Sequence, residues 1–148
     1  MSKVKFYYCT VCGNIIEMVH DSGNNPICCM RDMEEIEPGV TDGNLEYHVP
    51  TYTRHGHKIK VQIGKEPHPM EDMHYIEWIE LETTKGISRR YLKSGDKPTV
   101  RFRLCKDEEP LNIYAYCNKH KLWKCTYTPD DMEHQDECSR EYDRYTCD

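Results

Sequence analysis

The sequence predicts an all-β protein, with a small metal-stapled module at its N-terminus and a helical acidic tail at its C-terminus. Three observations predict this fold class. Short β-rich runs recur between closely spaced turn signals, which is typical of a sandwich or a barrel. Four of the nine cysteines fall within the first 37 residues. The last 23 residues hold the whole net charge of -6.

Residues 1–37 form the predicted module. A unit of this size cannot bury a sufficient apolar core and needs a staple. Two residues separate Cys9 from Cys12, so one tight turn can present both sulfurs to one ion, and the adjacent pair Cys28-Cys29 follows after fifteen residues. Four sulfur ligands in tetrahedral geometry fit zinc or iron, and the spacing leaves both metals open.

Residues 38–125 form the predicted β-rich body, and its first residues, 38–44, are expected to be the linker. Four runs are predicted strands: residues 58–63, 75–81, 99–104 and 111–116. The run 99–104 alternates most cleanly, so that Val100, Phe102 and Leu104 face inward. A sandwich and a barrel are both compatible with this spacing.

Residues 126–148 form the acidic tail, in which two bases and eight acids give 2 − 8 = -6. Thr128 as an N-cap, followed by proline and acids, predicts a helix that continues to about Tyr145. One face of this helix would carry His134, Cys138, Tyr142 and Tyr145. We interpret this face as a docking stripe, a row of side chains that packs against another surface. A metal site from His134 and Cys138 is the alternative, but two ligands are too few.

Composition disfavours several classes of protein. No stretch approaches the roughly 18 apolar residues of a membrane span. Residues 1–5 lack the apolar run of a secretory signal, so the nine cysteines are expected to be metal ligands or redox groups rather than a disulfide framework. Residues 1–125 contain 18 acids and 18 bases, and this neutral body disfavours nucleic-acid binding.

A second group of metal-binding residue types lies at or beside the predicted strand ends. Its members are His48, His68, His74, Cys117 and His120. Loops gather at one pole of a sandwich, and Pro50, Pro67 and Pro69 would hold these segments rigid. Imidazoles with one thiolate suit iron, copper or zinc. The sequence therefore predicts a second metal site at this pole.

The remaining histidines and one cysteine receive simpler interpretations. His55 and His57 flank Gly56 in an expected hairpin turn and should be solvated. His20 should lie near the tip of the small module. Cys105, at the end of a strand pattern, is expected to be a buried or half-buried thiol.

The order of both sites resembles the two-iron superoxide reductases, the desulfoferrodoxins, over residues 5 to about 125. The motifs that carry the resemblance are Cys9-x-x-Cys12-Gly13-Asn14, Cys28-Cys29, Glu46-x-His48-Val49-Pro50, His68-Pro69-Met70, His74-Tyr75-Ile76-Glu77-Trp78-Ile79 and Tyr116-Cys117-Asn118-x-His120-x-Leu122-Trp123. The acidic tail has no counterpart in this pattern.

The resemblance implies a desulforedoxin-like module followed by an immunoglobulin-like β-sandwich. It implies one iron, or possible zinc, held by Cys9, Cys12, Cys28 and Cys29. It implies a second iron held by His48, His68, His74 and His120 in a plane with Cys117 axial. Superoxide would be reduced there to hydrogen peroxide, and Glu46 would occupy the sixth position when the iron is oxidised. The family is typically a cytoplasmic homodimer, and its electron donor would be rubredoxin or a similar small redox protein.

One departure from the family pattern bears on activity. Tyr47 stands where the family commonly has a lysine that is thought to attract superoxide. Lys121 is the first candidate to replace that cation, and Lys65 is the second. Because of Tyr47, an electron carrier without useful superoxide chemistry is an alternative function. A zinc-stapled binding module that uses the acidic tail is a further alternative.

Overall fold

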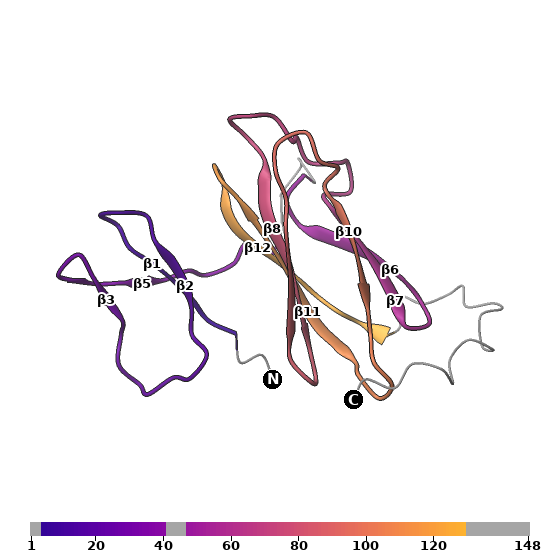
Figure 1. Cartoon of the computed structure of the whole chain (residues 1–148), viewed down its shortest axis with the longest axis horizontal. Helices are drawn as coiled ribbons and strands as arrows, with labels where there is room; N and C mark the ends of the chain where they lie inside the picture. The colour runs from indigo at the N-terminus through magenta and orange to yellow at the C-terminus, as the bar shows by residue number, and fades with distance from the viewer. Residues whose placement is uncertain (1–3, 41–46, 130–148) are drawn as a thin grey trace. The chain divides into compact units, whose positions relative to one another are not determined.

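The computed structural model describes residues 4–40 and 47–129 of the chain. The chain divides into two compact units, Met1–Pro38 and Gly39–Asp148, which are described separately here (Figure 1). The described residues form β-strands and no α-helix, so the all-β prediction is confirmed for them. Within the part of the chain described, no helix is long and apolar enough to span a membrane. The helix expected from Thr128 to Tyr145 lies almost wholly outside the described residues.

The N-terminal unit consists of five very short strands. They are β1 (Phe6–Tyr8), β2 (Ile15–Glu17), β3 (Ile27–Cys28), β4 (Arg31–Asp32) and β5 (Glu34–Glu35). They pair as a sheet of order β2-β1-β5 and a separate β3-β4 hairpin. Tyr7, Cys9 and Met33 form its small buried cluster. So little buried apolar surface agrees with the expectation that this unit needs a staple.

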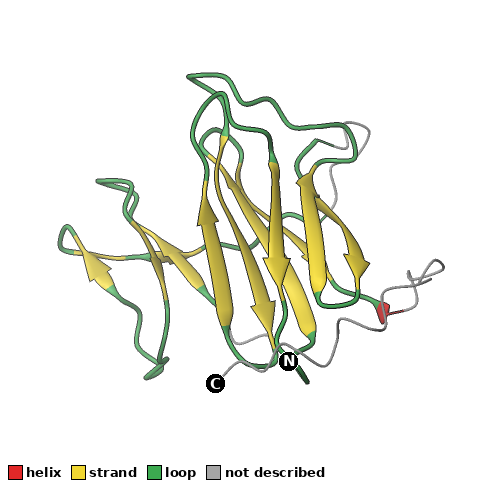
Figure 2. Ribbon diagram, turned by 45° about the vertical axis from the view of Figure 1, so that its right-hand side comes forward, coloured by secondary structure: helices red, strands yellow, loops and turns green. Residues whose placement is uncertain are grey.

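The second unit is a sandwich of two antiparallel sheets (Figure 2). One sheet has the order β10-β7-β6 and the other the order β12-β11-β8-β9. The strands are β6 (Pro50–His55), β7 (Lys58–Ile63), β8 (Ile76–Thr83), β9 (Ile87–Tyr91), β10 (Thr99–Arg103), β11 (Pro110–Cys117) and β12 (Lys121–Thr126). The second unit is therefore a sandwich and not a barrel.

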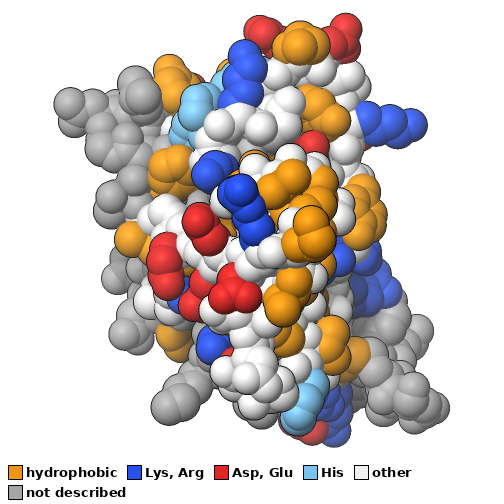
Figure 3. Space-filling view, turned by 90° about the vertical axis from the view of Figure 1, so that its left-hand side faces the viewer, with side chains coloured by type: hydrophobic (Ala, Val, Ile, Leu, Met, Phe, Trp, Pro, Cys, Tyr) orange, Lys and Arg blue, Asp and Glu red, His pale blue; other side chains and the backbone are white. Residues whose placement is uncertain are grey.

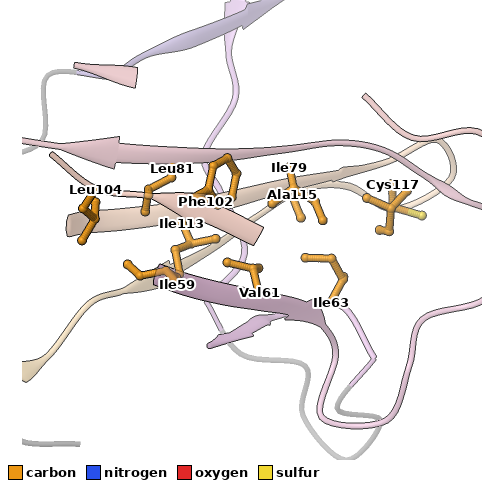
Figure 4. Close-up of a cluster of buried hydrophobic side chains, with 11 residues drawn as sticks. Ile59, Val61, Ile63, Ile79, Leu81, Phe102, Leu104, Ile113, Ala115 and Cys117 are labelled. Carbon is orange, nitrogen blue, oxygen red and sulfur yellow. The ribbon is translucent and has the colours of Figure 1, made fainter. Parts of the chain in front are cut away.

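The core lies between the two sheets, where alternate side chains of facing strands meet (Figure 4). In β7, Ile59, Val61 and Ile63 are fully buried while Lys58 and Lys60 are exposed. Phe102 and Leu104 are also buried, as their alternation predicts. The inward set continues through Ile79, Leu81, Ile113 and Ala115 to Cys117. Cys117 therefore lies at the end of the core rather than on the surface.

Some segments differ from the sequence-based expectation. Strands β6, β9 and β12 carry less regular apolar alternation, and the sequence pattern does not predict them. Gly39, expected in the linker, pairs with β12: its N–H donates to Leu122 O at 2.9 Å, and Lys124 N–H donates to Gly39 O at 2.8 Å. The sandwich also includes Tyr127, which is buried and donates its N–H to Leu111 O at 2.9 Å.

Candidate metal centres

The five residues of the predicted second site meet at one pole of the sandwich. Each flanks a strand: His48 and His74 precede β6 and β8, His68 follows β7, Cys117 ends β11 and His120 precedes β12. Antiparallel pairing brings the starts of β6, β8 and β12 to the same pole as the ends of β7 and β11. The potential ligand atoms all lie within 4.8 Å of one another.

The four imidazoles form a closed ring. The centroids of neighbouring rings are 5.0 Å apart for His48 and His68, 4.7 Å for His68 and His74, 4.9 Å for His74 and His120, and 4.6 Å for His120 and His48. Neighbouring rings meet at 63° to 80°. Cys117 Sγ lies 3.7 Å from His120 Nδ1.

The donor atoms of this ring suit a metal ion. Metal–nitrogen bonds of about 2.1 Å place adjacent nitrogens of a planar array about 3.0 Å apart and opposite ones about 4.2 Å apart. His48 Nε2 and His120 Nδ1 lie 2.9 Å apart. Within the described part of the chain, the buried Nε2 atoms of His68 and His74 have no hydrogen-bond partner. A bound cation would satisfy both.

Burial favours the neutral form of His68, His74 and His120, which is the form that binds metals. It lowers the pKa of His68 to about 4. His68 Nδ1 lies 2.6 Å from Pro69 O, which can only accept a hydrogen bond, so that nitrogen donates and Nε2 keeps its lone pair. Burial also lowers the pKa of His74 and His120, and Lys119 acts in the same direction.

The thiol of Cys117 has the opposite response to burial. Burial raises its pKa, while the backbone N–H groups of His120 and Lys119 lower it. A metal that binds this sulfur must therefore displace a proton. Cys117 is fully buried whereas His120 is exposed, so the cluster meets solvent at His120 and not at the thiol.

Asn118 ties together the two loops that carry three of the ligands. Its Oδ1 accepts from Tyr75 N–H at 3.0 Å, and its Nδ2 donates to Met73 O at 3.1 Å. Its own N–H donates to Tyr75 O at 3.2 Å. These bonds flank His74 on both sides and join it to the Cys117–His120 turn. The sequence does not predict this role of Asn118, because hydrogen bonds between residues 43 or more positions apart leave no periodic signal.

The position of His48 depends on a glycine and a tryptophan. Gly64 has φ +82 and donates its N–H to Val49 O at 3.1 Å. A Cβ at Gly64 would stand 2.6 Å from Tyr47 O, so only glycine permits this close approach. On the other side, Trp123 stacks on His48 with the ring centroids 4.6 Å apart. Backbone and side chain together fix this imidazole.

The structure describes two of the three proposed catalytic residues. Glu46 lies outside the described residues. Tyr47 is 39% exposed and next to His48. Lys121 is exposed, has φ +65, and pairs with Cys117 at the start of β12. Lys119 lies inside the Cys117–His120 turn, and its charge lowers the pKa of two of the four histidines, a role that the sequence motifs do not predict.

The four cysteines of the N-terminal unit form a second cluster, with all sulfurs within 4.8 Å of one another. Four sulfurs bound tetrahedrally at about 2.3 Å would stand about 3.8 Å apart. The Sγ atoms of Cys12 and Cys28 are 3.6 Å apart, and those of Cys28 and Cys29 are 4.0 Å apart. Backbone N–H donation from Cys12 lowers the pKa of Cys9 to about 6. This set is therefore also capable of binding a metal ion.

Two of the simpler expectations need correction. His55 and His20 are exposed, but His57 is half-buried rather than solvated, with both ring nitrogens buried. Cys105 is half-buried, as expected, but it is disulfide-bonded and not a thiol. Neither the burial of His57 nor the disulfide bond of Cys105 could be predicted from local alternation, because both depend on residues distant in sequence.

Comparisons with known proteins agree with both centres. Residues 41–126 match the family Desulfoferrodoxin, and residues 2–36 match the family Desulfoferrodoxin, N-terminal domain. A desulfoferrodoxin homolog of Archaeoglobus fulgidus is 42% identical over 121 residues, which cover 82% of this chain and 95% of the relative. The desulfoferrodoxin of Nitratidesulfovibrio vulgaris is 39% identical over 124 residues, covering 83% of this chain and 96% of the relative. The crystal structure of the superoxide reductase from Treponema pallidum is 30% identical with a TM-score of 0.71, covering 84% of this chain and 98% of that one.

Proposed function

Since this chain belongs to the desulfoferrodoxin family, we propose that it is a superoxide reductase that works at the four-histidine, one-cysteine centre. The reaction is O₂•⁻ + e⁻ + 2 H⁺ → H₂O₂. One observation carries the proposal: four imidazoles close a ring beside a fully buried thiol, and one member of the ring, His120, is exposed. A small anion can approach such a cluster where His120 is exposed, but not from the buried thiol.

The metal ligands in this proposal are those of the two clusters. His48, His68, His74, His120 and Cys117 hold one iron, and Cys9, Cys12, Cys28 and Cys29 hold another iron or a zinc. Iron at the histidine centre supplies the single electron. The remaining steps fall to the protein, which must attract an anion, exclude competing ligands and allow two protons to arrive.

The protein attracts superoxide by charge. Four neutral imidazoles and one thiolate leave a ferrous centre with a net charge of about +1. Lys119 adds an exposed cation within the ligand turn, and its charge acts on His74 and His120. Lys121 and Lys65 are further candidates for the same role. Tyr47, neutral at pH 7, is a poor substitute for a lysine as a proton source.

Glu46 is proposed to bind the iron of the histidine centre when that iron is oxidised. It precedes His48 by two positions in the sequence. The protons are proposed to come from solvent, which has access to the cluster at the exposed His120. Burial of Cys117 at the end of the core keeps water from the thiolate.

The test is the stoichiometry of superoxide consumption by anaerobically reduced protein. Superoxide generated by pulse radiolysis should yield one hydrogen peroxide for each superoxide consumed, with one electron lost from the protein. Dismutation would instead give one peroxide and one dioxygen for every two superoxide ions. That ratio, or no consumption at all, would overturn the proposal.

A second candidate function is an electron carrier without useful superoxide chemistry, which Tyr47 favours. It predicts reversible reduction of iron at both centres with no loss of superoxide. A zinc-stapled binding module predicts zinc at the centres and a colourless protein. Metal analysis and the visible spectrum before and after ascorbate separate this last case from the other two.

A further inference from the structure

We infer that Cys105 is cross-linked to one of the two cysteines of the acidic tail, Cys138 or Cys147, and that this disulfide holds the charge of the tail away from the histidine centre. The cross-link itself does not depend on the proposed function. Its consequence for superoxide rests on that function, and deepens it by adding a structural control over how easily the anionic substrate approaches the centre.

The partner of Cys105 follows from the number of cysteines. Cys105 is disulfide-bonded. The chain has nine cysteines, and six others among the described residues carry no disulfide: Cys9, Cys12, Cys28, Cys29, Cys117 and Cys125. Two cysteines remain, Cys138 and Cys147, and both belong to the tail. A disulfide within this chain therefore joins Cys105 to one of them.

Cys105 lies at the pole of the sandwich opposite the histidine centre. Arg103, the last residue of β10, pairs with Lys58 at the start of β7, whereas His68 follows the other end of β7. At a rise of about 3.3 Å per residue, the length of β7 separates the two poles by roughly 17 Å. A segment that is fastened at Cys105 is therefore kept about one strand length from the centre.

Hydrogen bonds fix the turn that carries Cys105, which is half-buried. Glu108 Oε2 accepts from Cys105 N–H at 2.7 Å, and Glu108 N–H donates to Cys105 O at 3.2 Å. Glu108 Oε1 accepts from Thr83 Oγ1 at 2.5 Å, at the end of β8. The turn is therefore a fixed point of attachment for the tail.

The tail is long enough to reach this turn. Arg54 Nη1 donates to Tyr127 Oη at 3.1 Å and to Glu109 Oε2 at 2.8 Å, and Glu109 lies four residues after Cys105. The chain from Tyr127 to Cys138 spans up to about 36 Å when it is extended. Both tail cysteines can therefore reach Cys105 from the point at which the tail begins.

Without the disulfide, the same segment can turn towards the histidine centre. Thr128 N–H donates to Tyr52 Oη at 3.0 Å, and Tyr52 lies in β6, four residues after His48. Four residues of extended chain correspond to roughly 13 Å. Charges in a mobile segment that starts at Thr128 can therefore come within a Debye length of the centre, which is about 10 Å at 0.1 M salt.

Most of the tail charge lies inside the closed loop, whichever tail cysteine is linked. Residues 129–137 contain no base and five acids, which are Asp130, Asp131, Glu133, Asp136 and Glu137. Residues 139–148 contain three acids and two bases, which gives 2 − 3 = -1. On the face drawn in Figure 3, the described residues show charged side chains of both signs, interspersed. The tail is thus a concentrated negative charge, and its position affects the field that superoxide meets.

Peptide mapping of the full-length, metal-loaded protein tests the cross-link. Oxidised glutathione completes the disulfide: two thiols give up two protons and two electrons to form the S–S bond, and oxidised glutathione takes them up to become two glutathione molecules. The remaining thiols are alkylated, and the protein is digested with trypsin. Cleavage after Lys124, Arg140 and Arg144 places the two tail cysteines in different peptides.

Mass spectrometry should find one disulfide-linked peptide that pairs Cys105 with Cys138 or with Cys147. The inference is overturned if Cys105 is recovered alkylated, or if it is paired with any other cysteine. It is also overturned if the bond is found only in a disulfide-linked dimer on a non-reducing gel, which would assign Cys105 to a contact between two chains.

Superoxide consumption by ascorbate-reduced protein tests the consequence, with the unlinked tail cysteine as the matched control. Cys105→Ser should slow consumption at least about twofold at low salt, and less as salt is added. Of Cys138→Ser and Cys147→Ser, the variant that removes the linked cysteine should be slowed equally, and the other should match the wild type. A Cys105→Ser chain that ends at Pro129 should regain the wild-type rate, because it has lost the charged segment.

These measurements separate an electrostatic role of the tail from a packing role of Cys105. Equal rates in the wild type and in all three single variants across the salt series would overturn the electrostatic role. A Cys105→Ser chain that stays slow after truncation at Pro129 would also overturn it. A mapped cross-link in a protein that consumes no superoxide would refute the proposed function and leave the cross-link in place. Normal consumption without the cross-link would refute this inference alone.

Discussion

Replacing Asn118 by alanine should loosen the histidine centre without removing any ligand. The substitution deletes two side-chain hydrogen bonds, to Tyr75 N–H and to Met73 O. Because Asn118 is exposed, each bond contributes about 0.5–1 kcal/mol net, or about 1–2 kcal/mol together. For a unit of this size, that lowers the unfolding temperature by roughly 4–16 °C.

The larger effect should be on metal affinity. Asn118 holds the backbone on both sides of His74 against the turn that carries Cys117 and His120. Loss of groups that orient metal ligands typically lowers affinity by about 10–100-fold. Asn118→Asp keeps an oxygen for Tyr75 N–H but loses the donor to Met73 O, so its loss of affinity should be intermediate.

The assay is chelator competition on zinc-loaded protein, followed by the ring ¹⁵N resonances of the four histidines. These signals report on the histidine centre and not on the thiolate cluster. Thr84→Ala is the control: its hydroxyl accepts from Glu109 N–H at 3.1 Å, and it lies just past Thr83, at the opposite end of β8 from Ile76. If Asn118→Ala retains wild-type affinity, or if Thr84→Ala loses as much, Asn118 does not position the site.

Four further outcomes are expected. Cys9→Ser should destabilise the N-terminal unit but leave superoxide consumption by the ascorbate-reduced protein intact, as stopped-flow or pulse-radiolysis traces would show. Cys117→Ser should abolish consumption, because it removes the thiolate ligand; undiminished rates would exclude Cys117 as a ligand. A chain that ends at Pro129 keeps β12 and the buried residue after it but loses a net charge of -6, so its encounter with superoxide should be unchanged or faster, most visibly at low salt. Lys119→Ala should slow encounter and Tyr47→Lys should speed it, each by up to about tenfold and less as salt is added; equal rates in all three proteins across a salt series would rule out steering by these side chains.

The local sequence pattern was sufficient to predict those strands whose structure is decided by burial alone. The alternation in β7 and β10 predicted both strands and their inward faces, because one side of each strand meets the core. Strand β9 has no such signal: Ile87 and Tyr91 are exposed, and the strand is held at the sheet edge by its pairing with β8. Its existence depends on the partner strand rather than on its own sequence.

The same division holds at the candidate site. The residue types of all five predicted ligands stood out in the sequence, and the fold brings them together. Asn118 and Gly39 did not stand out, because their roles exist only after distant segments meet. Gly39 is required because a Cβ there would stand 2.7 Å from the ring carbons of Trp123. Such contacts leave no trace in spacing or composition.

The stacking of Trp123 on His48 gives the protein a built-in optical sensor. The chain has only two tryptophans, and the other, Trp78, stacks on Tyr116 in β11. Indole emission is quenched by a transition metal held by a ring in contact with it, so Trp78→Phe would leave one tryptophan, whose emission reports the metal loading of the histidine centre. Because Trp123 also covers Gly39, the same emission would change when the segment that follows the N-terminal unit leaves β12. Metal loading and linker detachment could then be followed in a single unlabelled sample.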